Sequence, residues 1–195
     1  MIRMHRPPIE RQRAYDLCAA QVSRTGGSVV CFASAPSAQQ LIHWLPEVKT
    51  SLSRNKQEMS ASAAIWLDPV KNDGAQVLAQ IEHVLHPGGV LCVVAQGWLA
   101  RWLPTYQEYA PGSGAPANAA MICRWLSRSQ MKISACQGVL GPISFMWGAA
   151  AGRAQRLGRY DLADRCQFEM REGMVSTGWQ ASLSACVLVT ARKKG

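Results

Sequence analysis

The sequence predicts an α/β fold in which a mostly parallel sheet is flanked by helices. Three consecutive patterns support this prediction: an apolar run at 63–67, a helical pattern of apolar residues at 77–85, and a second apolar run at 90–95. Pro87, Gly88 and Gly89 separate the last two, because Pro cannot continue a helix and Gly can take the left-handed conformation at a helix end. Strand, helix and strand in this order form the crossover that joins two parallel strands.

The remaining segments extend this pattern in both directions. Before the crossover we expect a helix, a short buried strand, a second helix and a short strand, at 8–24, 28–32, 38–44 and 50–52. After it we expect a helix capped by Asn118, a strand, a mostly helical segment and a last strand, at 119–129, 132–140, 142–171 and 182–191. Arg11, Arg13 and Arg24 are expected on a basic face of the first helix.

The stretch from Leu85 to Val94 points to a known family. It reads Leu-His-Pro-Gly-Gly followed by an apolar strand, and it resembles the second half of the class I S-adenosylmethionine (SAM)-dependent methyltransferase fold. In that family a helix often ends in a leucine, a basic residue and Pro-Gly-Gly. The resemblance implies a Rossmann-like sheet whose last two strands form an antiparallel pair, and it implies SAM as cofactor. The predicted domain spans 1–195, with an N-terminal helix in 1–25 and a helical insertion at 142–172.

Two features depart from the family pattern. The loop that follows the first strand is normally rich in glycine, because glycine lets the backbone approach the cofactor closely. Here residues 33–37 contain no glycine, and Pro36 removes a backbone donor and restricts Ala35. The segment 34–63 is also short, so we expect one strand-helix unit to be trimmed or absent. Glu47 and Glu58 follow no convincing strand, and neither is assigned to the cofactor ribose.

Ser34, Ala35, Asp68 and Gln96 are the predicted cofactor-binding residues. Each follows or ends a predicted strand, and ligands of open α/β sheets bind beyond the carboxyl ends of the strands. Some amino-group methyltransferases carry Asp-Pro-Pro and an aromatic residue where this chain has Asp68 and Pro69, but the second proline and the aromatic are missing. The alternative interpretation, which we favour for this pair, is an ordinary strand end and turn.

Composition excludes several classes of function. The seven cysteines form no CxxC pair and the four histidines do not cluster with them, so no metal site is expected. The cysteines are predicted to be small core residues in a reducing compartment such as the cytoplasm. No apolar run approaches the ~20 residues of a membrane span. The net charge of +9 favours an anionic partner, such as nucleic acid, an acidic protein or a membrane surface, or serves solubility alone.

Three groups of residues are candidates for binding sites on the surface, and each also has an ordinary structural interpretation. Arg153, Arg156 and Arg159 share roughly one helix face, which suits phosphate or anionic lipid; a solvated face paired with nearby acids is the favoured alternative. The apolar residues at 145–147 suit a membrane surface or a lid, although core packing is the favoured outcome. Trp98 and Trp102 suit stacking on a ring, although packing against the sheet is again favoured.

Two functions follow from these observations. The first is an active SAM-dependent methyltransferase with an atypical cofactor loop. The second is a relative that kept the fold, lost the cofactor and works as a basic binding or assembly subunit. The glycine-free loop and the basic charge favour the second slightly, and the resemblance supports the first.

Overall fold

The computed structural model describes residues 9–33, 50–51, 60–103 and 115–195. Their seven strands are β1 Val29–Phe32, β2 Thr50–Ser51, β3 Ala61–Leu67, β4 Leu85–Gln96, β5 Met131–Val139, β6 Val175–Thr177 and β7 Cys186–Lys193. The helices are α1 Ile9–Val22, α3 Gly74–Val84, α5 Ala119–Ser127, α6 Pro142–Arg156, α7 Tyr160–Glu172 and α8 Trp179–Leu183, with short 3₁₀ helices η1 Ser23–Thr25 and η2 Trp98–Trp102. The predicted helix at 38–44 and turn at 33–37 lie largely outside the described residues.

One sheet contains all the described strands, in the order β2-β1-β3-β4-β7-β5-β6. β1 pairs in parallel with β2 and β3, and β3 with β4. β7 lies antiparallel between β4 and β5, and β6 extends β5 on its other edge. The predicted α/β class and the antiparallel pair of late strands are therefore confirmed. β6 adds a further antiparallel strand that was not predicted, because three residues are too few to show the apolar alternation of a strand.

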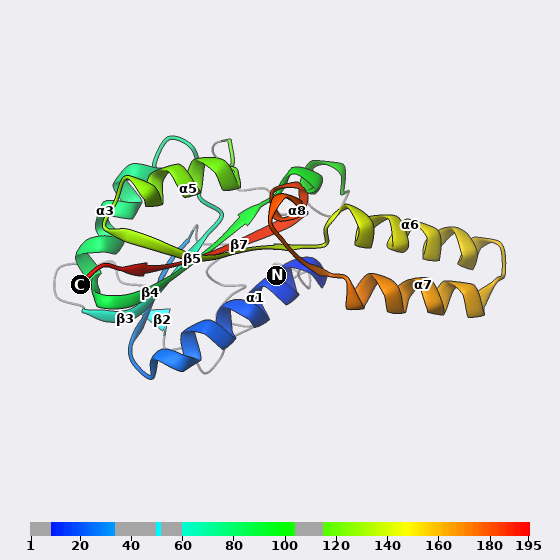
Figure 1. Ribbon diagram of the computed structural model, residues 1–195, viewed down its shortest axis with the longest axis horizontal. Coiled ribbons are helices and arrows are strands. Elements are labelled where there is room, and N and C mark those ends of the chain that lie inside the picture. Colours follow the sequence, from blue (N-terminus) through cyan, green and yellow to red (C-terminus); the bar gives the residue numbers. More distant parts are fainter. Residues whose placement is uncertain (1–8, 34–49, 52–59, 104–114) are drawn as a thin grey trace, which may run out of the picture.

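Helices cover both faces of the sheet (Figure 1). Side chains alternate along each strand, so Ile65 and Leu67 of β3 lie in the cluster beneath α1. Ala64 and Trp66 lie in the opposite cluster, against α3 and α5. This three-layer arrangement explains why β3 and β4 read as continuous apolar runs, since both of their faces are buried.

The Pro-Gly-Gly turn has a second role at the start of β4. The helix was predicted to include Leu85, but α3 ends at Val84 and β4 begins directly at Leu85 and includes the turn residues. The register with β3 shifts from Ala61 opposite Leu85 to Ala63 opposite Val90. Gly88 accommodates this irregularity with φ +78°, a left-handed backbone that favours glycine.

The expectation for Arg11 was wrong. The predicted first helix is α1 followed by η1, but Arg11 is 2% exposed and does not lie on a solvated basic face. Its guanidinium forms an ion pair with the carboxylate of Asp68, which directly follows β3. The charge of Arg11 can be buried because the opposite charge is buried beside it.

The last predicted strand begins later than expected. Residues 182 and 183 belong to α8, and β7 starts only at Cys186. The backbone between them bonds to the segment after β4: the Gly97 amide donates to the Ala185 carbonyl (2.8 Å) and the Leu99 amide to the Ser184 carbonyl (3.3 Å). Tertiary contacts therefore replace the strand pairing that the local apolar pattern predicts.

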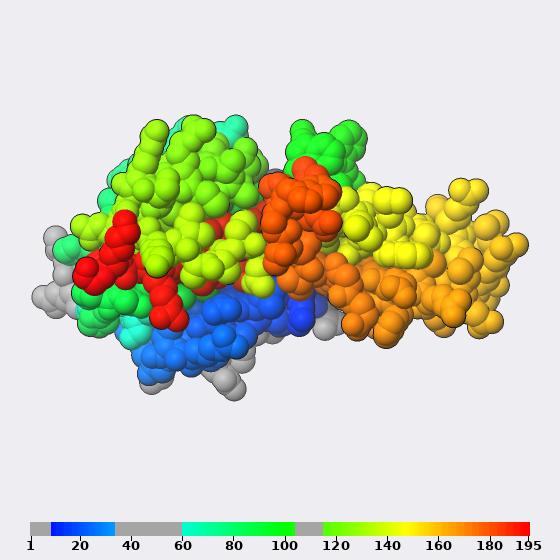
Figure 2. Space-filling model, viewed as in Figure 1, coloured from blue at the N-terminus to red at the C-terminus, as the bar shows by residue number. Residues whose placement is uncertain are grey.

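α6 and α7 form an antiparallel hairpin that projects beyond the end of the sheet (Figures 1 and 2). It occupies the segment predicted to be mostly helical. Core packing was favoured for residues 145–147, and this holds only for Phe145, which packs beside Leu99 and Leu140. Met146 is 70% exposed, and Trp147 is 40% exposed although it lies one turn from the buried Ser144 and Ala151.

Candidate functional site at the carboxyl edge of the sheet

The carboxyl ends of β3 and β4 bring two predicted site residues to one edge. The strands are parallel, with Leu67 opposite Val94, and the Asp68 amide donates to the Val94 carbonyl at 2.9 Å. Asp68, directly after β3, and Gln96, the last residue of β4, therefore lie at the same edge of the sheet. Ser34 and Ala35, like Pro36, lie outside the described residues.

Asp68 is held by the N-terminal helix. Its backbone has φ +49°, a left-handed conformation that aspartate tolerates better than most residues. Its side chain is 2% exposed, and Oδ2 accepts a hydrogen bond from Nη2 of Arg11. Arg11 Nε also donates to the Tyr15 hydroxyl at 2.8 Å. α1 thus closes over the end of β3, and Oδ2 of Asp68 is engaged by the protein itself.

Burial changes the titration of the groups around this ion pair. It raises the pKa of the Tyr15 phenol to about 12, so the hydroxyl stays protonated at neutral pH. Burial also raises the pKa of Glu10, whose Oε1 is buried without a hydrogen-bond partner. Both shifts follow from desolvation of the charged form.

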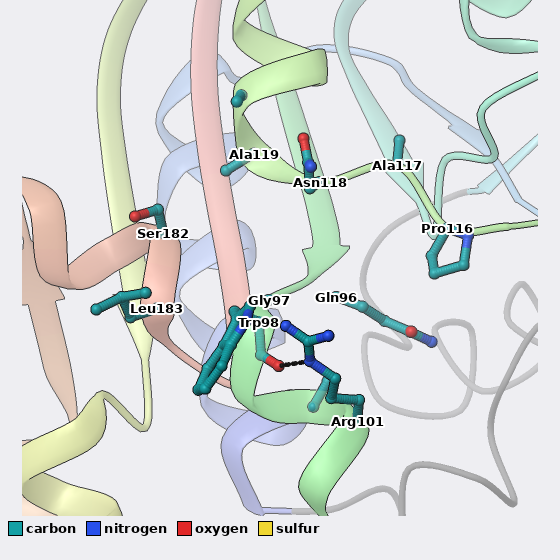
Figure 3. Close-up of a pocket in the computed structure, with 12 residues that line it drawn as sticks. Gln96, Gly97, Trp98, Arg101, Pro116, Ala117, Asn118, Ala119, Ser182 and Leu183 are labelled. Carbon is teal, nitrogen blue, oxygen red and sulfur yellow. Dashed lines mark hydrogen bonds between the residues drawn. The ribbon is translucent and has the colours of Figure 1, made fainter.

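Gln96 opens onto a pocket of about 370 Å³ (Figure 3). Four elements surround the pocket: the end of β4, η2, the start of α5 and α8. The lining side chains are small or polar apart from Trp98 and Leu183, and the lining residues are Gln96, Gly97, Trp98, Ala100, Arg101, Pro116, Ala117, Asn118, Ala119, Ala120, Ser182 and Leu183. The volume suits a small molecule.

One wall of the pocket is aromatic and cationic. The Arg101 guanidinium lies 4.6 Å from the centre of the Trp98 ring, and Arg101 Nε donates to the Trp98 carbonyl at 3.3 Å. Packing against the sheet was favoured for Trp98 and Trp102, and this was wrong: both are exposed, with ring centres 6.2 Å apart. Leu99 and Ala100 are the buried residues of η2, which leaves the tryptophans directed outward.

The opposite wall connects the pocket to the loop after β3. Asn118 caps α5 as predicted, since its Oδ1 accepts from the Met121 amide at 2.9 Å. Immediately before it, the Ala117 amide donates to the Pro69 carbonyl at 2.8 Å. The backbone after Asp68 is therefore bonded to the pocket wall.

Gln96 carries an unsatisfied donor. Its Nε2 is buried and has no hydrogen-bond partner, although buried polar atoms are nearly always paired. A ligand oxygen or ring nitrogen would satisfy this amide. Of the pocket residues, Gln96 was predicted to bind the cofactor, and Trp98 was a candidate for stacking on a ring. Arg101 and Ser182 carried no site signal, because α8 and η2 come together only in the folded chain.

Comparison with solved structures identifies the architecture. The N-methyltransferase NodS of Bradyrhizobium japonicum WM9, in complex with S-adenosyl-L-homocysteine (SAH), matches with a TM-score of 0.50 and 10% identity, over 100% of this chain and 92% of NodS. A SAM-dependent methyltransferase of Thermotoga maritima, described as a possible histamine N-methyltransferase, matches with a TM-score of 0.50 and 13% identity, over 94% and 91%. This chain has the class I methyltransferase fold.

The same fold also occurs in a protein with a different named activity. The [4+2]-cyclase SpnF matches with a TM-score of 0.51 and 15% identity, over 94% of this chain and 81% of SpnF. No protein-family model and no curated protein matches the sequence. The methyltransferase fold is thus shown by structure, and the activity has to be argued from the site.

SAM is the cofactor that a methyltransferase fold implies. Gln96 fits such a ligand, because its orphaned amide needs an acceptor. Asp68 fits less well, since Arg11 engages Oδ2. Within the described part of the chain no group of three metal-ligating side chains is assembled, and no helix has the length and apolar character needed to cross a bilayer.

Proposed function

We propose that this protein is a SAM-dependent methyltransferase that modifies a small molecule bound in the pocket at Gln96. The observation that carries the proposal is the buried, unpaired Nε2 of Gln96 beside that pocket. The carboxyl edge is where ligands of open α/β sheets bind. The SAH complex of the similarly folded NodS adds support.

The roles of the residues follow from their positions. When bound, SAM supplies a methyl group on a positively charged sulfur, which a nucleophile of the acceptor can take. Gln96 would donate a hydrogen bond to the cofactor, and Trp98 with Arg101 would hold a planar or anionic part of the acceptor. Alignment of two bound reactants can supply several kcal/mol of the barrier, so the chain needs no further reactive side chain for this step.

The test is a calorimetric titration of the full chain with SAM and with SAH. We expect binding by the unchanged protein, and an affinity lowered roughly 3- to 10-fold by Gln96→Leu, the loss expected for one hydrogen bond to a ligand. Gln76→Leu is the matched control, because Gln76 is exposed on α3 and does not line the pocket. Equal affinities of the two variants would remove Gln96 from the site. No binding by folded protein would overturn the enzyme proposal.

A second candidate is a basic binding or assembly subunit that does not use SAM. The Arg11–Asp68 ion pair favours it, because this pair neutralises an acidic side chain at the site edge. The glycine-free sequence at 33–37 and the net charge of +9 agree with it. The same titration separates the two functions: a folded protein that ignores SAM and SAH but forms a stable complex with an anionic partner supports this candidate.

A further inference from the structure

The α6–α7 hairpin exposes much of the apolar surface of the described residues. Eleven large hydrophobic side chains are exposed in this part of the chain, and seven of them belong to the hairpin: Ile143, Met146, Trp147, Leu157, Tyr160, Leu162 and Phe168. Single exposed apolar residues need no explanation, but a concentration on one projecting element indicates an interaction surface.

The hairpin packs on itself through small residues. Ser144, Ala151 and Ala154 are the buried residues of α6, and Ala163 and Cys166 those of α7. A Cβ on Gly148 would lie 3.0 Å from the Met170 sulfur, and the Ser144 hydroxyl donates to the Gly173 carbonyl at 2.5 Å. The two helices therefore approach closely. Ile143 and Met146 stay largely exposed beside this seam, and Trp147 lies at its margin.

Part of this exposed surface forms a single stripe along α6. Ile143, Met146 and Trp147 stand at positions i, i+3 and i+4, which share one face of a helix. Leu157, directly after the end of α6, follows about three turns after Met146 on the same side. Ile143 is 56% exposed. We call these four residues the α6 stripe. An aromatic and apolar stripe of this kind is typical of a helix that lies at a membrane interface.

Arginines lie at the far end of the α6 stripe. Arg153, Arg156 and Arg159 are exposed, and within the described part of the chain no acid lies at ion-pair distance from them. The predicted solvated face is therefore present, but the expected pairing with nearby acids does not occur among the described residues. Asp161, Asp164 and Glu172 share the face of α7 opposite Ala163 and Cys166, and so point away from α6.

We infer that the α6 stripe and its arginines dock the protein onto the surface of a membrane that contains anionic lipid. The stripe would enter the boundary between headgroups and acyl chains, and the arginines would pair with lipid phosphates. Association of two copies is disfavoured, because each carries a net charge of +9 and would bring the same arginines together. The negative charge of an anionic membrane complements the arginines at the end of the α6 stripe and the net positive charge of the whole chain.

Flotation of the full chain with lipid vesicles tests this inference. We expect binding to vesicles of phosphatidylglycerol and phosphatidylcholine, weakening with salt, and no binding to phosphatidylcholine alone. Met146→Ala with Trp147→Ala should weaken binding at least about 10-fold, because two large apolar side chains no longer enter the bilayer. Arg153→Ala with Arg156→Ala should weaken it roughly 5-fold for each arginine.

Matched controls keep the test specific. Phe168→Ala removes an exposed aromatic from α7, and Arg124→Ala with Arg128→Ala removes the same charge from exposed positions on and beside α5; both should bind vesicles as the unchanged protein does. Equal binding to neutral vesicles, no binding to anionic vesicles, or equal losses in the controls would overturn the inference. Binding of RNA or soluble phosphate without vesicle binding would overturn it as well. SAM affinity should be unchanged in all these variants. Vesicle binding therefore tests this proposal alone, and SAM binding tests the enzyme proposal alone.

Discussion

At the scale of single residues, three buried charged groups lie near the start of α1 and the end of β3. Arg11 and Asp68 compensate each other, so the cost of removing both from water is partly offset. Glu10 is also buried, at 4% exposure, but its Oε1 has no hydrogen-bond partner. Glu10 is therefore a local source of instability whenever its carboxyl group is ionised.

The raised pKa of Glu10 predicts a definite pH dependence. The folded protein binds the Glu10 proton more tightly than the unfolded chain does, so this group lowers the free energy of unfolding as the pH rises from the ordinary glutamate range through the raised pKa. Glu10→Gln should remove that decline and make the protein more stable at pH 7, by about 1 kcal/mol. Urea unfolding at several pH values between 4 and 8 measures this.

The control for this prediction is Glu169→Gln, on the exposed surface of α7. It should leave the pH dependence of the free energy of unfolding unchanged. If Glu10→Gln follows the same pH curve as the unchanged protein, the carboxyl group of Glu10 is not desolvated in solution.

At the scale of elements, the helical layer over Trp66 depends on one close approach. The rings of Trp66 and Trp125 stack with centres 6.0 Å apart and an angle of 21° between their planes. Gly74, at the start of α3, faces the Trp125 ring, and an added Cβ would lie 2.2 Å from its nearest atom. A glycine is needed here for space, because Trp125 is already fixed between α3 and β3.

Gly74→Ala should therefore destabilise the fold by about 1 to 3 kcal/mol, the usual effect of overpacking. Gly152→Ala is the matched control, since that glycine also lies in a helix but its Cβ would meet nothing within 4 Å. There the helix propensity of alanine should stabilise by roughly 0.5–1 kcal/mol. Thermal or denaturant unfolding of both variants distinguishes the two sites, and equal shifts in the same direction would contradict the packing argument.

At the scale of the whole molecule, stability is unevenly distributed. β3, β4 and β7 are buried on both faces between α1 on one side and α3 with α5 on the other. The α6–α7 hairpin projects from this body (Figure 2) and buries mainly small side chains. Less apolar burial means that less free energy is needed to open the hairpin than to open the sheet.

Native-state hydrogen exchange should show this difference directly. Backbone amides in β4 and β7 are expected to exchange slowest, near the rate of global unfolding. Amides of α6 and α7 should exchange roughly 10-fold or more faster, which corresponds to an opening free energy lower by at least about 1.4 kcal/mol. Equal protection of hairpin and central strands would show that the hairpin unfolds only with the whole domain.

Local patterns predicted most of the elements and one residue of the pocket. Asn118 caps α5 and the crossover from β3 to β4 forms as expected, because capping and periodicity act over a few residues. The prediction that Gln96 lies at the carboxyl edge of the sheet agrees with the structure, because the carboxyl ends of parallel strands meet at the same edge. Arg101 and Ser182 were missed, since their contribution to the pocket depends on η2 and α8, which meet through backbone bonds around Ser184 and Ala185.

The sequence by itself determined the α/β class, the crossover and the helical segment before the last strands, because apolar period and turn residues record local geometry. Only the tertiary structure decided that Arg11 is buried against Asp68, that Met146 and Trp147 are exposed, and that Gln96 lines a pocket and has a buried, unpaired Nε2. Burial depends on which distant elements meet, and no local pattern specifies that. An amphipathic helix has the same sequence signature whether its apolar stripe meets a core, a partner or a membrane.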